Sequence, residues 1–238
     1  MGIQTNLNYF HWLLEAMPRL WLAQREGLAA DATVWLPQLR PWMADMIDAL
    51  QPIDRRATQG DGITRCARLL MPARGLSNIH TFGAHAFAMA DEIRERFAPA
   101  APSGRRFFVT RAGAGSRKLI NEDEIIAIAA QHGFETIEPQ HLAFREQVEL
   151  FSGAGAIAGP LGAGLANAVF MRPGSALIEI APEGREGDAT LFANLAHHRQ
   201  LDYLAAVGPT VSTDTRAVDR RDFSVDTEII HKMFAALG

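Results

Sequence analysis

The first segment of the chain, residues 8–26, has apolar residues at the spacing of an amphipathic helix. Pro18 lies inside this pattern and lacks a backbone N–H, so a kink or a break is expected there. His11 and Glu15 fall on a different face of the same helix, four residues apart. That polar face either lines a cleft or is simply exposed to solvent.

The patterns that follow, up to residue 98, are less regular. Residues 32–36 predict a strand, and residues 41–50 predict a helix whose first residue is a well-placed proline. Residues 52–62 are rich in Arg, Asp, Gln and Gly and predict a loop. Residues 63–71 show partial strand alternation, and residues 87–97 predict another helix.

A stretch rich in proline, residues 99–104, is the clearest break in composition, and we place a boundary between residues 1–100 and 101–238 there. Beyond it, short apolar runs and amphipathic segments alternate regularly. The expected strands are 107–110, 134–137, 156–158, 176–180 and 201–207, and the expected helices are 121–131, 143–153, 163–170, 189–198 and 225–237. This alternation predicts an α/β fold with a parallel, doubly wound sheet that binds ligands at the carboxyl ends of its strands.

A glycine loop lies between two of the expected strands, at Gly162 and Gly164. Glycines let a ligand approach the backbone closely, and a helix that follows directs free N–H groups toward an anion such as a phosphate. With Asn167, the loop partly matches the GxGxxG dinucleotide pattern, but it lacks the last glycine and occurs late in the domain. A tight turn that needs small residues is an equally good interpretation.

Positive charge gathers around a second glycine loop, residues 112–116. The basic residues are Arg105, Arg106, Arg111, Arg117 and Lys118. Arginine's planar fork suits phosphate oxygens, although ion pairs with the acidic residues 122–124 are the alternative. Because Arg111 and Arg117 follow an expected parallel strand, they should lie at the same sheet edge as Gly162. The two loops together predict one anion pocket.

Two further polar residues occupy informative positions. Glu179 lies near the end of an expected strand, where a carboxylate can accept hydrogen bonds from ribose hydroxyls, or else form an ion pair with Arg172 or Arg185. Asn121 is expected to cap the helix that follows, with Glu124 three residues later.

Composition narrows the function classes. A net charge of −4 gives no global attraction to nucleic acid or anionic membranes, so anion binding must be local. The single cysteine, Cys66, excludes an intramolecular disulfide and is expected to be a small core residue. No apolar run is long enough for a transmembrane helix, and no signal peptide is recognised, which favours a cytoplasmic setting. Without an HxxxH or DxD triplet, no metal and no cofactor are expected.

Four sequence blocks, taken together, resemble glycosyltransferase family 61, which includes capsular-polysaccharide enzymes. The resemblance rests on NYFHWLLEAMPRL (8–20), FVTRAGAGSRKLINEDEI (108–125), the long block 133–182 and the later Leu201-Asp202-Tyr203. It implies a GT-B-like fold of two Rossmann-like parallel-sheet domains. The N-terminal domain, residues 1–100, is expected to be short or truncated on the acceptor side, so that a second copy or a partner chain would complete it. Residues 101–238 are expected to bind the nucleotide-sugar.

The resemblance also implies an inverting, metal-independent transfer of a sugar from a nucleotide-sugar to a glycan or polysaccharide acceptor. A UDP-sugar is the first candidate for the donor. By the same resemblance, Arg111 and Arg117 would hold the diphosphate. Glu15 is the first candidate for the catalytic base and His11 the second. The other donor-binding candidates are Asn121, Gly162, Ala163, Gly164, Asn167 and Glu179.

One position departs from the family pattern. The family usually has His where this chain has Leu161, and leucine can neither donate to a phosphate nor take up a proton. This favours an alternative, a weak or inactive nucleotide-sugar-binding or assembly protein of the same fold. A Rossmann-type oxidoreductase is a third option, which the absence of an early GxGxxG pattern disfavours. Peripheral attachment to the inner membrane is compatible with any of these.

Overall fold

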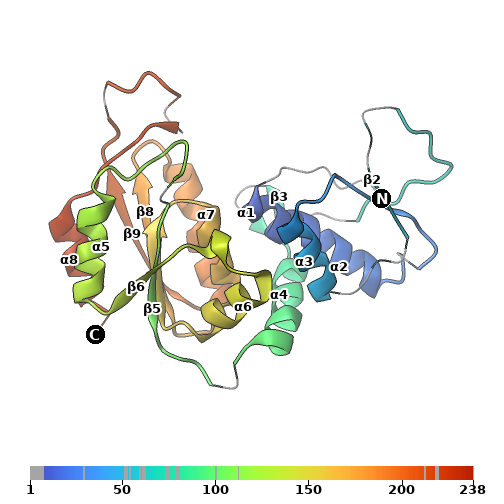
Figure 1. Cartoon of the computed structure of the whole chain (residues 1–238), viewed down its shortest axis with the longest axis horizontal. Helices are drawn as coiled ribbons and strands as arrows, with labels where there is room; N and C mark the ends of the chain where they lie inside the picture. The colour runs from blue at the N-terminus through green and yellow to red at the C-terminus, as the bar shows by residue number, and fades with distance from the viewer. Residues whose placement is uncertain are drawn as a thin grey trace.

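A computed structural model describes residues 8–28, 30–50, 53, 55–58, 60, 63–72, 76–78, 81–99, 101–111, 113–211, 213–217 and 220–237. Figure 1 shows a central sheet between two layers of helices, with the N-terminal helices packed outside one of those layers.

The main sheet has five strands in the order β6-β5-β7-β8-β9, and all of its neighbouring strands are parallel. The strands are β5 (Arg106–Val109), β6 (Phe134–Ile137), β7 (Ala156–Pro160), β8 (Ala176–Pro182) and β9 (Asp202–Gly208). This is the 2-1-3-4-5 order of flavodoxin-like sheets, in which ligands bind where the strand order reverses. The reversal lies between β5 and β7. The predicted parallel α/β sheet is therefore confirmed.

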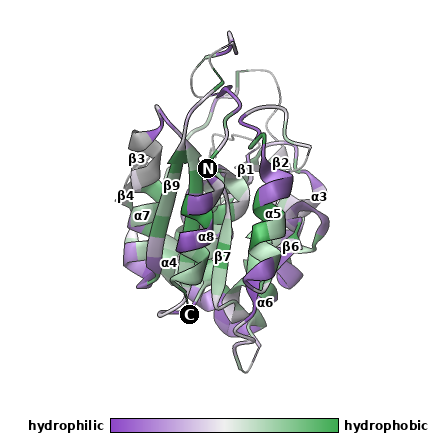
Figure 2. Ribbon diagram, turned by 90° about the vertical axis from the view of Figure 1, so that its left-hand side faces the viewer, coloured by the Kyte–Doolittle hydropathy of each residue, from purple (hydrophilic) through white to green (hydrophobic). Residues whose placement is uncertain are grey.

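Helices cover both faces of this sheet because its strands alternate their apolar side chains between two cores. Helices α5 (Glu122–Gln131) and α8 (Thr227–Ala235) pack on one face, the face toward the viewer in Figure 2. The other face is covered by α6 (Phe144–Gly153), the 3-10 helix η3 (Ala163–Phe170) and α7 (Glu186–Arg199). The helix expected at 163–170 is therefore present, but as a 3-10 helix.

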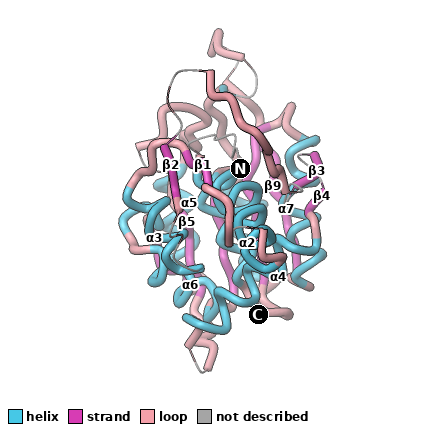
Figure 3. Tube along the Cα trace, turned by 90° about the vertical axis from the view of Figure 1, so that its right-hand side faces the viewer, coloured by secondary structure: helices cyan, strands magenta, loops and turns pink. Residues whose placement is uncertain are grey.

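The N-terminal part adds a helical layer next to η3, with α2 and α4 in front of the sheet in Figure 3. A continuous helical run comprises α1 (Tyr9–His11), the π-helix η1 (Trp12–Ala16) and α2 (Met17–Arg25), and it is followed by α3 (Pro41–Leu50) and α4 (Ala84–Phe97). Strand β1 (Val34–Leu36) pairs in parallel with β2 (Arg56–Thr58), and β3 (Leu76–Asn78) pairs antiparallel with β4 (Thr81–Phe82). Trp12, Leu13 and Met46 share one core with Phe170 and Leu177, which joins this layer to the main sheet.

At Pro18 a kink or a break was expected, and the break does not occur. A π-turn precedes the proline, in which the N–H of Met17 donates to the carbonyl of Trp12, and the helix continues. Other local predictions for the N-terminal part are wrong. The expected loop 52–62 contains β2, and residues 63–71 form no strand. Cys66 is exposed rather than in the core. In the described residues, no helix has the length and apolar character needed to cross a bilayer.

Candidate functional site

A cavity of about 350 Å³ opens at the carboxyl ends of β5 and β7, where the strand order reverses. Its walls come from the ends of both strands, the loops that follow them, and α1, α6 and η3. The lining includes Tyr9, Val109, Thr110, Arg111, Gln147, Pro160, Ala163, Gly164 and Asn167. The structure therefore places the Gly162–Gly164 loop and Arg111 on one cavity, at the position where a sheet of this kind binds its ligand.

A second cavity, of about 210 Å³, lies between the N-terminal helix and the same sheet edge. It is lined by Asn8, Phe10, His11, Arg117, Leu161, Gly162, Ala163, Arg185, Leu191 and Phe192. Ala163 lines both cavities, so they share the Gly162–Gly164 loop as a common wall. His11 from the N-terminal part thus lines the same cavity as two arginines of the sheet edge.

Arg111 is held at this edge by backbone carbonyls. Its Nη1 donates to the carbonyl of Leu161 at 3.1 Å, and its Nη2 donates to that of Ser116 at 3.1 Å. Burial above all, together with the positive charges of Arg117 and Arg185, lowers the pKa of Arg111 to about 10, against the opposing effect of Glu122. The group stays protonated at neutral pH, and among the described residues its buried Nε has no hydrogen-bond partner.

Arg117 and Arg185 complete a cluster of positive charge around Arg111. Arg117 has a φ of 56°, a left-handed conformation that is uncommon for a residue with a side chain. Sequence reasoning treated Arg185 only as an ion-pair partner, because it belongs to no recognisable motif. Its position just before α7, after the end of β8, is the signal that could have placed it at the carboxyl edge.

Arg105 and Arg106, two other basic residues of the predicted cluster, do not reach this edge. Arg105 forms an ion pair with Glu135, and Arg106 donates to the carbonyls of His132 and Leu237. Both arginines lie at the beginning of β5, so they belong to the opposite edge of the sheet. Including Arg105 and Arg106 in one anion cluster was therefore wrong.

His11 and Glu15 contact each other, with 2.5 Å between Nδ1 of His11 and Oε1 of Glu15. Their side chains are 31% and 29% exposed, so the pair is neither sealed in the core nor fully solvated. His11 lines the smaller cavity, whereas Glu15 does not. This arrangement places the imidazole next to the arginine cluster, with the carboxylate behind it.

Asn167 is fully buried and joins three elements rather than presenting a free amide to a ligand. Its Oδ1 accepts from the hydroxyl of Tyr9 at 2.6 Å, and its Nδ2 donates to Oε1 of Gln147 at 3.0 Å. The amide also donates to the carbonyl of Gly164 at 3.3 Å. Asn167 therefore fixes α1 and α6 against the glycine loop while it forms part of the cavity wall.

Glu179 lies in the middle of β8 and is fully buried, so it is not at the strand end. The hydroxyl of Tyr203 donates to its Oε2 at 2.6 Å, and Oε1 has no hydrogen-bond partner among the described residues. Burial raises the pKa of Glu179 to about 7, although the hydrogen bond from Tyr203 and the charge of Arg185 oppose this shift. Near neutral pH, a substantial fraction of this carboxyl group is therefore protonated.

Asn121 precedes α5, but its side chain does not cap that helix. Its amide nitrogen donates to the carbonyl of Val225 at 2.8 Å, and its Oδ1 accepts from the N–H of Val225 at 3.2 Å. The predicted capping interaction is therefore wrong, because a contact between segments distant in sequence uses both ends of the amide.

The sequence model described as Glycosyltransferase 61 matches residues 9–178. This chain belongs to the glycosyltransferase 61 family. The matched residues run from α1 into β8 and include His11, Arg111 and the glycine loop, whereas Arg185 lies beyond the match. No curated protein matches the sequence.

As a family 61 glycosyltransferase, the enzyme must bind a sugar donor and an acceptor. Positive charge is concentrated at this sheet edge, and the His11–Glu15 pair lies beside it. In the part of the chain that the structure describes, His, Cys, Asp and Glu side chains form no group of three that could hold a metal ion.

Proposed function

We propose that this enzyme transfers a sugar from a nucleoside diphosphate-sugar to a glycan acceptor, with inversion at the anomeric carbon. A UDP-sugar is the first candidate for the donor. The observation that carries the proposal is the arginine cluster, Arg111, Arg117 and Arg185, at the carboxyl edge of the sheet beside the reversal of strand order. A diphosphate would bring negative charge to Arg111, on which the positive charges of Arg117 and Arg185 already act. Guanidinium groups would stabilise the leaving diphosphate directly, so the proposed reaction needs no metal ion.

Within this proposal, His11 is the catalytic base and Glu15 orients it. Because Glu15 contacts Nδ1, the other ring nitrogen, Nε2, is the one that can take up a proton. The acceptor oxygen attacks the anomeric carbon as its proton passes to His11, and the bond from that carbon to the diphosphate oxygen breaks. The diphosphate leaves with the electron pair and is held by the arginines.

In this proposal, the two halves of the chain bind the two substrates, as in a GT-B-like enzyme. Residues 1–100 would form the acceptor side, and residues 101–238 the donor side, with the cavity between His11 and Arg185 at their junction. Gly162, Ala163 and Gly164 would let the donor approach the backbone. Asn121 and Asn167 would support the site through their interactions with Val225 and Tyr9. A reducing, cytoplasmic setting suits a chain with a single cysteine.

Leu161 supports a second candidate, a nucleotide-sugar-binding protein of the same fold with little or no transfer activity. Its side chain is buried in the core, and its backbone carbonyl accepts from Arg111. The polar group that the family resemblance places there is absent from the sequence. Nucleotide-sugar binding without transfer to any acceptor would favour this second function.

A thermal-shift experiment with UDP in the presence of EDTA tests donor binding. At about one hundred times its dissociation constant, UDP adds roughly 2.7 kcal/mol to the free energy of unfolding. For a chain of this size, the melting temperature should rise by about 5–10 °C. Arg111→Ala should remove the shift, whereas Arg105→Ala, at the opposite sheet edge, should keep it. A clean melt with no shift from UDP, UDP-sugars or GDP-sugars would contradict the proposal.

A further inference from the structure

The backbone conformation of Arg117 requires support from another part of the chain. A left-handed residue with a side chain persists only where surrounding contacts hold it. Arg117 belongs to the irregular segment between β5 and α5, which also contains the carbonyl of Ser116 that accepts from Arg111. The contacts that fix this segment therefore also set the direction of two arginines in the anion site.

Those contacts come from residues 220–223, far along the sequence. The N–H of Arg117 donates to the carbonyl of Arg220 at 3.2 Å, and the N–H of Lys118 donates to Oδ1 of Asp222 at 2.8 Å. Phe223 continues the pairing: its N–H donates to the carbonyl of Lys118 at 3.0 Å, and its carbonyl accepts from Ile120 at 2.8 Å. Contacts to the backbone thus hold both the left-handed residue and the residues directly after it.

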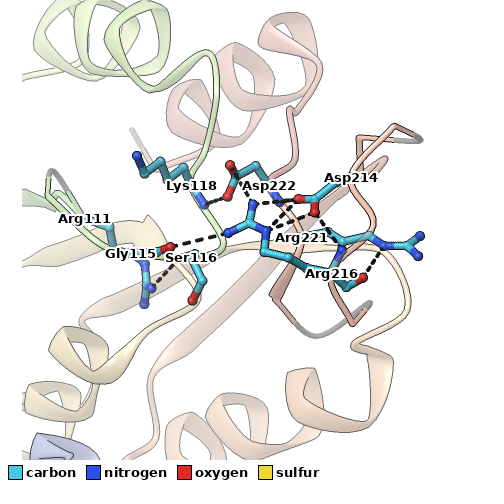
Figure 4. A network of polar contacts seen from close by, with 8 residues as sticks. All are labelled: Arg111, Gly115, Ser116, Lys118, Asp214, Arg216, Arg221 and Asp222. Carbon is cyan, nitrogen blue, oxygen red and sulfur yellow. Dashed lines mark hydrogen bonds and ion pairs between the residues drawn. The ribbon is translucent and has the colours of Figure 1, made fainter.

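A charged cluster in turn holds Asp222, as Figure 4 shows. The guanidinium of Arg216 lies 2.6 Å from Oδ2 of Asp214 and 2.9 Å from Oδ2 of Asp222. It also donates to the carbonyl of Gly115 at 3.4 Å. The N–H of Asp222 donates to Asp214 at 3.2 Å. Arg216 therefore bridges two carboxylates and the segment that carries Arg117.

We propose that Asp222, held by Arg216 and Asp214, is a positioning residue that fixes Arg117 in its left-handed conformation and directs its guanidinium into the phosphate site. This inference rests on the proposed donor function and deepens it. The three cluster residues lie beyond the family match, which ends at residue 178, and they line neither cavity of the site. Asp222 acts on the donor through Arg117.

A double-mutant cycle with UDP as the probe, measured by calorimetry, separates positioning from general structural support. Asp222→Ala should weaken UDP binding by about tenfold in the wild-type background, the effect of a misplaced charge-assisted contact. In the Arg117→Ala background the same change should weaken binding by less than about twofold, because the residue it positions is absent. Asp202→Ala, at the exposed start of β9, is the matched control and should leave UDP affinity unchanged.

Equal losses from Asp222→Ala in both backgrounds would overturn the positioning role, and so would no loss in either. If Arg117→Ala weakens binding but Asp222→Ala does not, the donor function stands and only this inference falls. If Arg111→Ala and Arg117→Ala both leave UDP binding unchanged, the donor function falls with it. Should Asp222→Ala not fold, Asp222→Asn takes its place in the cycle. Its amide oxygen can still accept from Lys118, while its charge pairing with Arg216 is lost.

Discussion

A Cβ atom added to Gly162 would lie 2.1 Å from Nη1 of Arg111 and within 3.2 Å of its Cζ. The backbone of Gly162 is extended, with a φ of −175°, so any residue could adopt it. The glycine is therefore needed for the space that it leaves to the guanidinium and not for its own conformational freedom.

Gly162→Ala should accordingly act on ligand binding. The added methyl displaces the guanidinium from the carbonyl of Leu161, and UDP affinity should fall by about tenfold or more, since a bidentate charged contact depends on its geometry. Isothermal calorimetry measures this change. Gly60→Ala, where a Cβ also meets nothing within 4 Å and which lies away from both cavities, is the control and should bind UDP normally. Equal affinities for wild type and Gly162→Ala would remove Arg111 from the donor site.

The contact between His11 and Glu15 predicts unequal kinetic effects. If His11 takes up the proton, His11→Gln should lower kcat by about 10²–10⁴-fold. Glu15→Gln keeps an oxygen that can face Nδ1, so its loss should be smaller, about tenfold. Initial rates with a nucleotide-sugar and an acceptor identified by screening give both numbers. A larger loss in Glu15→Gln than in His11→Gln would reverse the two roles.

Glu179 should make the stability of the protein depend on pH. Its pKa is about 7 in the folded protein, against an ordinary value of 4.5, so the folded state binds more protons between these values. The contribution of Glu179 to stability is then fully present below about pH 4.5 and is lost as the pH rises through about 7, a loss of roughly 3 kcal/mol. Glu179→Gln removes this ionisation, so its denaturation midpoint should change less between about pH 5 and pH 8. Identical pH profiles for the two proteins would exclude Glu179 as the source.

Tyr9 should contribute to stability through its hydroxyl. Tyr9→Phe leaves the buried Oδ1 of Asn167 without its 2.6 Å donor, which should cost about 1–3 kcal/mol. Urea denaturation followed by far-UV circular dichroism measures this loss. A change below about 0.5 kcal/mol would mean that water or another group replaces the hydroxyl.

Much of the C-terminal half could be predicted from sequence because its strands are short apolar runs between turn residues. The predicted strand 134–137 coincides with β6, and the predicted helix 143–153 differs from α6 by one residue. Strand β2 was missed because Arg56–Thr58 is polar and becomes a strand only through pairing with β1. Such pairing depends on tertiary contacts that the local pattern does not encode.

The site was predictable to a similar degree. Loops that follow neighbouring parallel strands must meet at one sheet edge, so Arg111 and the Gly162 loop could be placed together before the structure was known. The hydrogen-bond partners of two asparagines could not be predicted. Tyr9 is 158 residues from Asn167, and Val225 is 104 residues from Asn121. A buried amide can be satisfied by many groups, and only the fold decides which of them is near.

If the proposed donor binds in the larger cavity, the position of Asn167 constrains how donor selectivity can change, whether by evolution or by design. A substitution that reshaped the cavity at this amide would also release α1 from the sheet edge and α6 from the glycine loop, so new selectivity there would come with a less stable enzyme. Gln140 lines the same cavity, and among the described residues its amide bonds only to nearby Glu138. Libraries that vary Gln140 and keep Asn167 should therefore yield more folded variants with altered donors.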